Sequence, residues 1–342
     1  MAAINILNNK KILFFSVQTF NLEKEIIKKL EEFGSKVDYY DERPANNNFI
    51  KGIIRFKRSI YQYKIDKYYH SVLEVVKNKK YDFLFVNKGE VVPSFFLEKF
   101  KNINTKCIFI FYTWDSMENN IHAKEILKYF DKTFTFDPKD AREYHMNFRP
   151  LFYLDDYEKI KKNKGEFLHD LIFLGTAHSD RYIVSKQIVN WCNNVGLKTF
   201  TYYFMQGKLV YLFKRLYDKT FKEFDYKKLS FTSLTKEQII QLYDKSKVIL
   251  DINHPQQRGL TLRTFESIGA GKKLITTNKD IVNYSFYNPN NILVIDRKNI
   301  ILDKKFFEND YQDISNELYL ASSLNGWINT IFNTHQENIW KK

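Results

Sequence analysis

The stretch RGLTLRTFESIGAGKKLIT, residues 258–276, predicts a glycine turn, a short helix, a glycine stop and a buried strand. A helix N-terminus that follows a glycine presents free backbone N–H groups and the positive end of the helix dipole, which suit a phosphate. Arg258 can add a charged, bidentate contact to a diphosphate. The ionised Glu266 can accept hydrogen bonds from the two hydroxyls of a ribose. These features predict a nucleoside-diphosphate site; the alternative is a helix capped by glycines with solvated charges.

Apolar runs alternate with amphipathic stretches along the rest of the chain. Residues 11–17, 81–86 and 107–112 predict buried parallel strands, and residues 22–33 predict a helix that ends at Gly34. Further strands are expected at residues 36–40, 132–136, 171–175, 198–204, 248–252 and 291–295. This repeated alternation predicts the α/β class, with parallel sheets covered by helices on both faces.

A chain of 342 residues is longer than one hydrophobic core usually serves, so two domains are expected. We expect a Rossmann-like domain at residues 1–155, a charged linker at 156–166 and a second Rossmann-like domain at 167–315. Residues 316–342 are expected to hold an amphipathic C-terminal helix that can cross back onto the first domain.

The composition and charge of the chain limit the classes of partner that the protein can bind. The net charge of +14 implies an anionic partner, which is nucleic acid, a nucleotide phosphate or the anionic inner face of a membrane. Basic and aromatic residues interleave at 50–80 and 208–228, as in a helix that lies on a membrane surface. The alternative is a helix whose apolar side packs in the core. No nucleic-acid-binding signature is present, no apolar run has membrane-spanning length, and the N-terminus carries no cleavable signal. We therefore expect a cytoplasmic protein, peripheral on the inner membrane face, that binds no nucleic acid.

The segment at residues 258–276 resembles the donor-binding segment in the C-terminal domain of GT-B glycosyltransferases. The resemblance implies two Rossmann-like domains that face a cleft, a glutamate that holds the donor ribose, and a nucleotide-sugar substrate, most often a UDP-sugar, with no cofactor. Retaining members carry a second glutamate eight positions before the ribose glutamate, and Arg258 stands there, which favours inversion. The positions that match are Gly259, Leu260, Glu266, Ala270 and Gly271.

The N-terminal half resembles the bacterial capsule and lipopolysaccharide group of GT-B-like proteins. The resemblance rests on the order and spacing of four motifs, which are residues 87–90, 112–116, 134–140 and 150–153. It implies a hexosyltransferase-type enzyme that adds a sugar to a surface glycan, free or lipid-linked. A nucleotide-sugar epimerase can use the same scaffold, and so can a catalytically silent nucleotide-sugar-binding protein.

Ligands in open α/β sheets bind beyond the carboxyl ends of the strands. Transfer with inversion needs one general base near the acceptor hydroxyl. Asp115 follows the strand that we expect to be central and is the first candidate, and Glu90 is the second. The alternative role for Asp115 is a helix N-cap, and Asp137, which precedes Pro138, also looks like a cap.

The same rule selects candidates for donor binding in the second half of the chain. Arg263 is expected to face the phosphates or to pair with Glu266 three positions later. No Asp-x-Asp segment follows an apolar strand and no Cys/His cluster has metal-ligand spacing, so we expect no catalytic metal. The donor-binding candidates are Gly175, Thr176, Arg181, His254, Arg258, Gly259, Thr261, Arg263 and Glu266.

Overall fold

The computed structural model describes residues 4–45, 58–163, 165–333 and 339–341, which form two compact units. Unit 1 comprises Met1–Pro150 and Leu324–Asn338, and unit 2 comprises Leu151–Ser323 and Ile339–Lys342. Each unit contains one six-stranded parallel sheet, so the expected α/β architecture with two Rossmann-like domains is confirmed.

The sheet of unit 1 has the strand order β2-β1-β3-β4-β5-β6. Its inner strands are apolar on both faces because helices cover both sides, which explains their uninterrupted hydrophobic runs. Phe14 and Phe85 stack across the neighbouring strands β1 and β3, with ring centroids 4.9 Å apart. The strands are β1 (Lys11–Ser16), β2 (Lys36–Asp41), β3 (Phe83–Asn87), β4 (Ile108–Thr113), β5 (Lys132–Thr135) and β6 (Asn147–Phe148).

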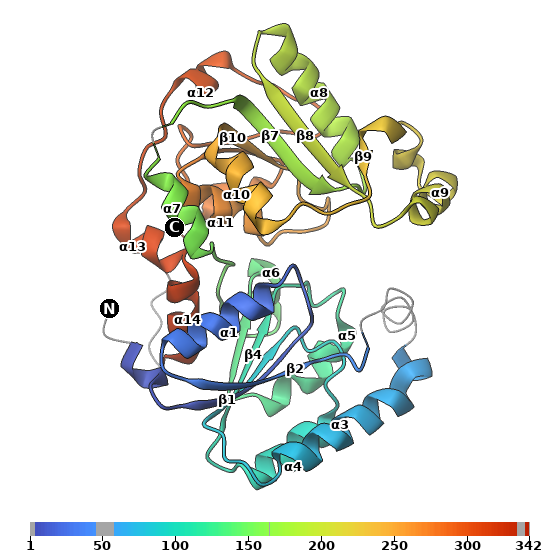
Figure 1. The fold of residues 1–342 in the computed structure, drawn as a ribbon, viewed down its shortest axis with the longest axis vertical. Helices are drawn as coiled ribbons and strands as arrows, with labels where there is room; N and C mark the ends of the chain where they lie inside the picture. The colour runs from blue at the N-terminus through green and yellow to red at the C-terminus, as the bar shows by residue number, and fades with distance from the viewer. Residues whose placement is uncertain (1–3, 46–57, 164, 334–338, 342) are drawn as a thin grey trace. The chain divides into compact units, whose positions relative to one another are not determined.

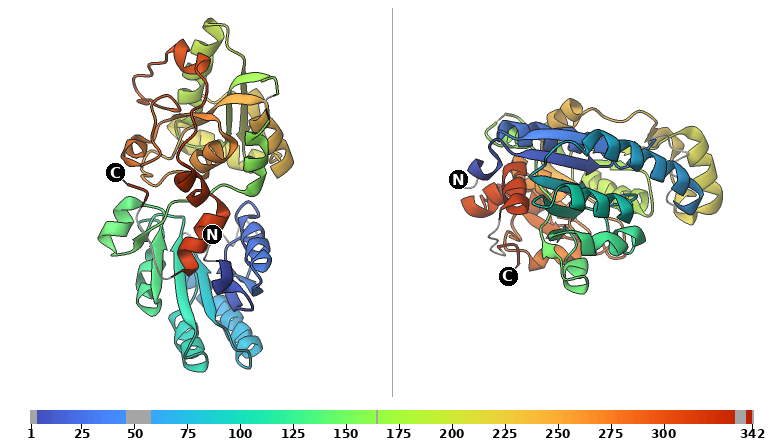
Figure 2. Two further views of the ribbon diagram at one scale, coloured as in Figure 1. Left: turned by 90° about the vertical axis from the view of Figure 1, so that its left-hand side faces the viewer. Right: turned by 90° about the horizontal axis from the view of Figure 1, so that it is seen from below.

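The helices of unit 1 include one from the far end of the chain. Trp327 of α14 (Leu324–Phe332) is fully buried, and its ring centroid lies 4.7 Å from that of Tyr112 on β4. Figures 1 and 2 show α14 beside the strands and α1 of unit 1, so the C-terminal helix does cross back. The other helices are η1 (Ile4–Leu7), α1 (Leu22–Glu32), η2 (Arg58–Tyr61), α3 (Gln62–Val76), α4 (Ser94–Ile103), α5 (Ile121–Ile126), η3 (Leu127–Tyr129) and α6 (Pro138–Glu143).

The structure tests the membrane-surface interpretation for only part of the basic stretch at residues 50–80. Residues 50–57 lie outside the described residues. The rest forms η2 and α3, and the apolar side chains of α3 are buried in the core of unit 1. For α3, the core-packing alternative is therefore correct.

The sheet of unit 2 has the strand order β12-β11-β10-β7-β8-β9, again with parallel neighbours. Its strand β10 lies between β7 and β11, and residues Val248, Ile249 and Leu250 of β10 are fully buried. The strands are β7 (His169–Thr176), β8 (Thr199–Phe204), β9 (Leu229–Ser230), β10 (Ser246–Asp251), β11 (Lys273–Thr276) and β12 (Ile292–Val294).

The stretch expected to be a linker, residues 156–166, includes most of a helix of unit 2. Helix α7 (Asp155–Lys161) has acidic residues in its first turn and lysines in its last, which complement the helix dipole. Tyr157 and Ile160, three positions apart, bury one face of α7 against its neighbours α10 and α11. The remaining helices are α8 (Arg181–Asn194), α9 (Lys208–Tyr217), η4 (Lys219–Phe221), η5 (Tyr226–Lys228), α10 (Lys236–Asp244), α11 (Leu262–Ala270), η6 (Lys279–Asn283), α12 (Lys304–Glu308) and α13 (Asn316–Ala321).

Helix α11 and strand β11 form from the segment at residues 258–276, as predicted. Gly271 ends the helix in the left-handed conformation, with φ of 60°. Gly269 has a different role, because it allows the ring of Tyr153 to pack closely against α11. A Cβ atom at this position would lie 2.5 Å from that ring. None of the helices in the described part of the chain combines the length and the apolarity that crossing a membrane requires.

Candidate functional site

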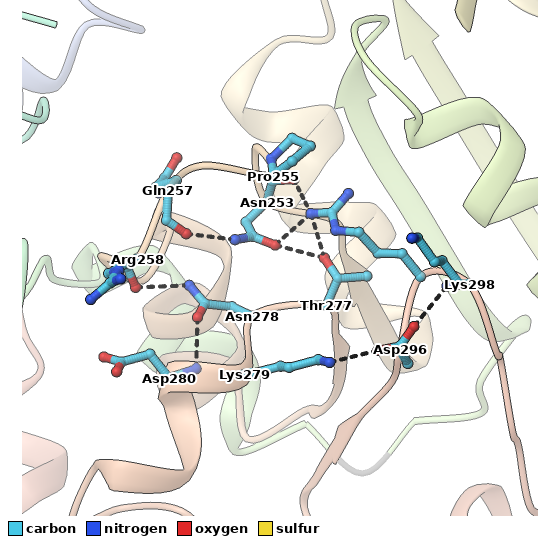
Figure 3. A pocket seen from close by; sticks show the side chains of 11 residues that line it. Asn253, Pro255, Gln257, Arg258, Thr277, Asn278, Lys279, Asp280, Asp296 and Lys298 are labelled. Carbon is cyan, nitrogen blue, oxygen red and sulfur yellow. Dashed lines mark hydrogen bonds and ion pairs between the residues drawn. The ribbon is translucent and has the colours of Figure 1, made fainter. Parts of the chain in front are cut away.

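Unit 2 contains a polar pocket at the carboxyl ends of β10, β11 and β12, with a volume of about 580 Å³ (Figure 3). This is the edge of the sheet at which open α/β folds bind ligands. Basic side chains outnumber acidic ones in its lining, which favours an anionic ligand. The lining residues are Asn253, Pro255, Gln257, Arg258, Thr277, Asn278, Lys279, Asp280, Asp296, Arg297 and Lys298.

The buried side chain of Asn253 connects the three loops that build this pocket. Its Oδ1 accepts hydrogen bonds from the Thr277 hydroxyl at 2.6 Å and from Nη2 of Arg297 at 2.8 Å. Its Nδ2 donates to the carbonyl of Gln257 at 2.8 Å. One amide thus ties together the loops after β10, β11 and β12, as Figure 3 shows.

A second buried amide fixes the turn before α11. Nδ2 of Asn278 donates to the carbonyls of Arg258 at 3.0 Å and Gly259 at 3.4 Å. Oδ1 of Asn278 accepts from the backbone N–H of Asp280 at 3.0 Å. The main chain at Arg258 is therefore held in place, while its exposed side chain lines the pocket and is available to a ligand.

Arg297 is a pocket residue that sequence reasoning did not select. Its Nη1 lies 2.6 Å from Oδ1 of Asp180, and its Nη2 donates to the carbonyl of Asn253 at 2.5 Å. Arg297 comes three residues after β12, so the rule of carboxyl ends, applied to the last strand as well, would have found it.

The N-terminus of α11 rests on a buried carboxylate at the end of β10. The hydroxyl of Thr261, the N-cap residue, donates to Oδ2 of Asp251 at 2.8 Å and makes no capping bond to the helix. Burial raises the pKa of Asp251, and the nearby cations Arg263, Arg181 and Arg297 act in the opposite direction. Thr261 therefore leaves the first-turn N–H groups of α11 uncapped by its own side chain.

Glu266 and Arg263 lie in a cluster of charged and phenolic groups within unit 2. The hydroxyl of Tyr243 on α10 donates to Oε2 of Glu266 at 2.9 Å. Burial lowers the pKa of Arg263, but Tyr243, Glu266 and Asp251 outweigh it, so the net shift is upward. The Tyr243 hydroxyl therefore occupies one acceptor position on the carboxylate predicted to hold the ribose.

The other predicted donor-binding residues do not line the pocket. Gly175 and Thr176 end β7, and Arg181 begins α8. Nε of Arg181 donates to the carbonyl of Ile252 at 2.7 Å, which ties α8 to the chain just after β10. His254 is exposed in the same loop as Arg258. Arg258 is thus the predicted donor residue whose side chain lines the pocket.

In unit 1 the two candidate bases lie on either side of one lysine. Nζ of Lys88 is 3.3 Å from Oδ2 of Asp115 and 3.4 Å from Oε1 of Glu90. Nε of the buried Arg43 donates to Oε2 of Glu90 at 2.5 Å. The fold thereby brings together the chain segments after β2, β3 and β4, at the carboxyl ends of these strands.

The backbone that carries Lys88 has an uncommon conformation. Lys88 has a φ of 98° and Gly89 a φ of 66°, and a Cβ atom on Gly89 would lie 2.5 Å from the ring of Phe111. Positive φ at a non-glycine residue costs about 1–3 kcal/mol, and such strain clusters at functional sites. Nδ2 of Asn120 donates to the carbonyl of Lys88 at 2.7 Å and helps to hold the turn.

Glu42 is the second functional candidate that sequence reasoning missed. It is fully buried, and its carboxyl oxygens accept from the backbone N–H groups of Gly89 at 2.8 Å and Glu90 at 2.7 Å. Burial, helped by the charge of Glu90, raises the pKa of Glu42 to about 8, although the two N–H donors act to lower it. Glu42 follows β2 directly, so its position at a strand end was a usable signal.

Asp115 is partly exposed and does not cap a helix. Its Oδ1 accepts from the backbone N–H of Ser116 at 3.0 Å, whereas the N-cap of α5 is Asn120, so the N-cap alternative is wrong. Asp137, in contrast, does cap α6, because its side chain accepts from the N–H groups of Lys139 and Asp140. Asp115 is thus left with an accessible carboxylate beside a cation.

Comparisons with known proteins bear on the fold. No protein-family model matches the sequence, and no curated protein matches it. An α-glucosyltransferase in complex with UDP and a 13-mer DNA with a central A:G mismatch superposes with a TM-score of 0.55 and 13% identity, over 88% of this chain and 89% of that one.

Two further solved structures have the same arrangement of elements. HepE of Anabaena, in complex with UDP and glucose, gives a TM-score of 0.53 and 11% identity over 95% of this chain and 96% of its own. A glycosyltransferase from Rickettsia africae gives 0.51 and 13% over 85% of each chain. The chain therefore has the GT-B fold.

Proposed function

We propose that this protein is a glycosyltransferase that moves a sugar from a nucleotide-sugar donor to a glycan acceptor. The observation that carries the proposal is the polar, cationic pocket beside the turn before α11. It lies at the ligand-binding edge of the sheet in a GT-B fold, and similar structures hold UDP in complex.

In this proposal unit 2 holds the donor. The side chains of Arg258 and Arg297 and the first-turn N–H groups of α11 bind the diphosphate, whose charge grows as the sugar leaves. Glu266 accepts from the ribose hydroxyls while it keeps its hydrogen bond from Tyr243. These donors supply the electrophilic assistance, so the proposed reaction needs no metal.

Unit 1 supplies the base. Asp115 is the better candidate of the two, since 34% of its side chain is exposed against 10% for Glu90. Asp115 takes the proton from the acceptor hydroxyl, the oxygen attacks the anomeric carbon, and the nucleoside diphosphate departs. Glu90 lies between Arg43 and Lys88 and positions the lysine that borders Asp115.

The finer assignments of the proposal follow the sequence resemblance. We propose hexosyl transfer from a UDP-sugar, with inversion, onto a capsule or lipopolysaccharide acceptor. A cytoplasmic location on the inner membrane face fits this acceptor and the net charge of +14.

A thermal-shift panel of UDP, GDP, CMP and dTDP tests the donor site first, because a ligand that binds the folded state raises its apparent stability. We expect UDP to raise the melting temperature most. Release of UDP from a UDP-sugar in the presence of acceptor then tests catalysis. Isomerisation of the sugar without UDP release would indicate an epimerase, and nucleotide binding without turnover would indicate a silent binding protein; either outcome would overturn the proposal.

A further inference from the structure

Helix α9 exposes an apolar face that the rest of unit 2 leaves uncovered. Figure 1 shows α9 at the outer edge of the unit, past the edge strand β9. The exposed fractions of its apolar side chains reach 81% at Leu209, 75% at Leu216 and 64% at Phe213. The core-packing alternative for residues 208–228 is therefore wrong for this face of α9, but it is correct for Tyr211, Phe221 and Phe224, which are buried in the core of unit 2. The exposed apolar side chains, which we call the α9 stripe, are Leu209, Val210, Leu212, Phe213, Leu216 and Tyr217.

The opposite side of α9 anchors the helix to unit 2. Tyr211 is 1% exposed, and its ring centroid lies 5.2 Å from that of Tyr226. Nζ of Lys214 lies 4.9 Å from the ring centroid of Phe221, a fully buried residue of the core. The α9 stripe is thus held outward by contacts that do not involve it, and none of its side chains is buried in the described structure.

Exposed cations border one side of the α9 stripe. Successive helical residues turn by about 100°, so the stripe spans an arc of roughly 160° with Tyr211 opposite its centre. Lys208 and Arg215 are exposed and fall beside one edge of this arc. Lys214 falls beside the other edge, but its ammonium lies over the ring of Phe221 and belongs to the anchoring side. Helix α9 contains no acidic residue. An apolar face flanked by cations matches the hydrocarbon boundary and the anionic headgroups of a bilayer, whereas a protein partner needs no such charged border.

We infer that α9 is a membrane-docking element that lies in the headgroup region of an anionic bilayer, with the α9 stripe inserted and its flanking cations on lipid phosphates. This inference assigns an element to the membrane location included in the proposed function, but it is argued from α9 alone and does not depend on the glycosyltransferase activity. If the proposed function also holds, the enzyme acts where an acceptor carried by lipid is presented.

Vesicle sedimentation of the full chain tests this inference without any sugar donor. We expect the protein to sediment with vesicles of phosphatidylcholine and phosphatidylglycerol at low salt. High salt should lower its affinity for these vesicles by on the order of tenfold. Pure phosphatidylcholine vesicles are expected to bind it far less. Equal binding to both compositions would overturn the anionic-surface inference.

Two matched variants distinguish vesicle binding through the α9 stripe from binding through the rest of the surface. Phe213→Glu places a carboxylate in the stripe and should reduce vesicle binding by at least about tenfold. Ile301→Glu makes the same kind of change at another exposed position of unit 2, where 72% of the side chain is accessible, and should leave binding unchanged. Equal loss in both variants, or in neither, would contradict a specific role of α9.

A fluorescent label reports insertion directly. The native thiols Cys107 and Cys192 are buried, so a Phe213→Cys variant can be labelled selectively with an environment-sensitive dye. Its emission should shift to shorter wavelength on anionic vesicles. An unchanged emission would overturn insertion. Concentration-dependent dimerisation without vesicles, abolished by Phe213→Glu, would assign the α9 stripe to a second copy of the chain and would equally overturn the inference.

Discussion

The ammonium group of Lys88 lies 3.3 Å from a carboxylate oxygen of Asp115, although the two residues come from different strand ends of unit 1. The lysine is buried and its backbone is held at a φ of 98°, so its position is set by the fold. The aspartate is accessible, which makes it the member of this pair that can meet an acceptor hydroxyl. The carboxylate of Asp115 is therefore held beside a positive charge whose position is fixed by the fold.

Replacing Asp115 by asparagine should abolish most of the turnover. We expect Asp115→Asn to lower kcat by about 10²–10⁴-fold, because general-base assistance contributes this much. Donor affinity should not change, since the substitution lies in unit 1. Steady-state kinetics and nucleotide titration measure both. Asp131→Asn is the matched control, because Asp131 also pairs with a lysine, Lys101, at 2.9 Å but lies elsewhere on unit 1. Equal activity of the two variants would contradict the assignment of the base.

Glu90 should matter for stability as well as for activity. Its removal leaves the buried Arg43 without this carboxylate, and breaking a buried ion pair costs about 3–5 kcal/mol. We expect Glu90→Ala to lower the melting temperature by roughly 6–20 °C. Glu74→Ala, which breaks an exposed pair with Lys77, should change it by no more than about 2 °C. Calorimetry distinguishes the two, and similar shifts would show that the Glu90 network is not buried in solution.

Glu42 predicts a specific pH dependence of stability. Its pKa in the folded protein is raised to about 8 by burial, above its ordinary value. At a pH between the ordinary pKa of a glutamate, 4.5, and this raised pKa, Glu42 is protonated in the folded state and ionised in the unfolded state. The free energy of unfolding therefore falls as the pH rises towards 8. In Glu42→Gln this contribution should disappear. Melting temperatures between pH 5 and pH 8 should decline less steeply in the variant, and parallel curves would refute the shifted pKa.

Arg258 should recognise the phosphates of the donor. We expect Arg258→Ala to weaken UDP binding by about 10–100-fold and to leave uridine binding nearly unchanged, because only the diphosphate carries the charge that it meets. The fold should be intact, since the side chain is exposed. Calorimetric titration with both ligands measures this, with the exposed Arg142→Ala as control. Loss of uridine binding to the same degree would show that the effect is on the shape of the pocket.

Turnover should not depend on a divalent cation. The pocket provides Arg258, Lys279, Arg297 and Lys298, so protein cations can balance the charge of the leaving diphosphate. Activity should therefore be the same after dialysis against EDTA as before it. Activity that is lost on chelation and restored by manganese would show that these side chains do not suffice.

The regular elements were predictable because their signals are local. The runs at residues 11–17, 107–112 and 248–252 are apolar without interruption, and the corresponding strands are covered on both faces. Helix α7 escaped prediction because its charges suggested a solvated linker. Only the spacing of Tyr157 and Ile160 indicated a buried face, and a pair of apolar residues in seven is a weak periodic signal.

The candidate site was predictable in part. The rule of strand ends found Asp115, Glu90 and Arg258, all of which lie in polar clusters in the structure. It was not applied to the ends of β2 and β12, and so Glu42 and Arg297 were missed. Their importance depends on what surrounds them, which no local pattern states.

The sequence by itself determined the class of the fold, the alternation of its elements and the turn and helix at residues 258–276, because hydrophobic period and glycine placement act over a few residues. Tertiary structure alone decided which charges meet. Lys88 comes between Asp115 and Glu90, and Asn253 joins three loops, only because parallel strands bring distant segments to one sheet edge. It also decided that the α9 stripe stays exposed, since burial depends on whether another element covers a face. Pairing and burial are properties of neighbours in space, and a linear pattern does not contain them.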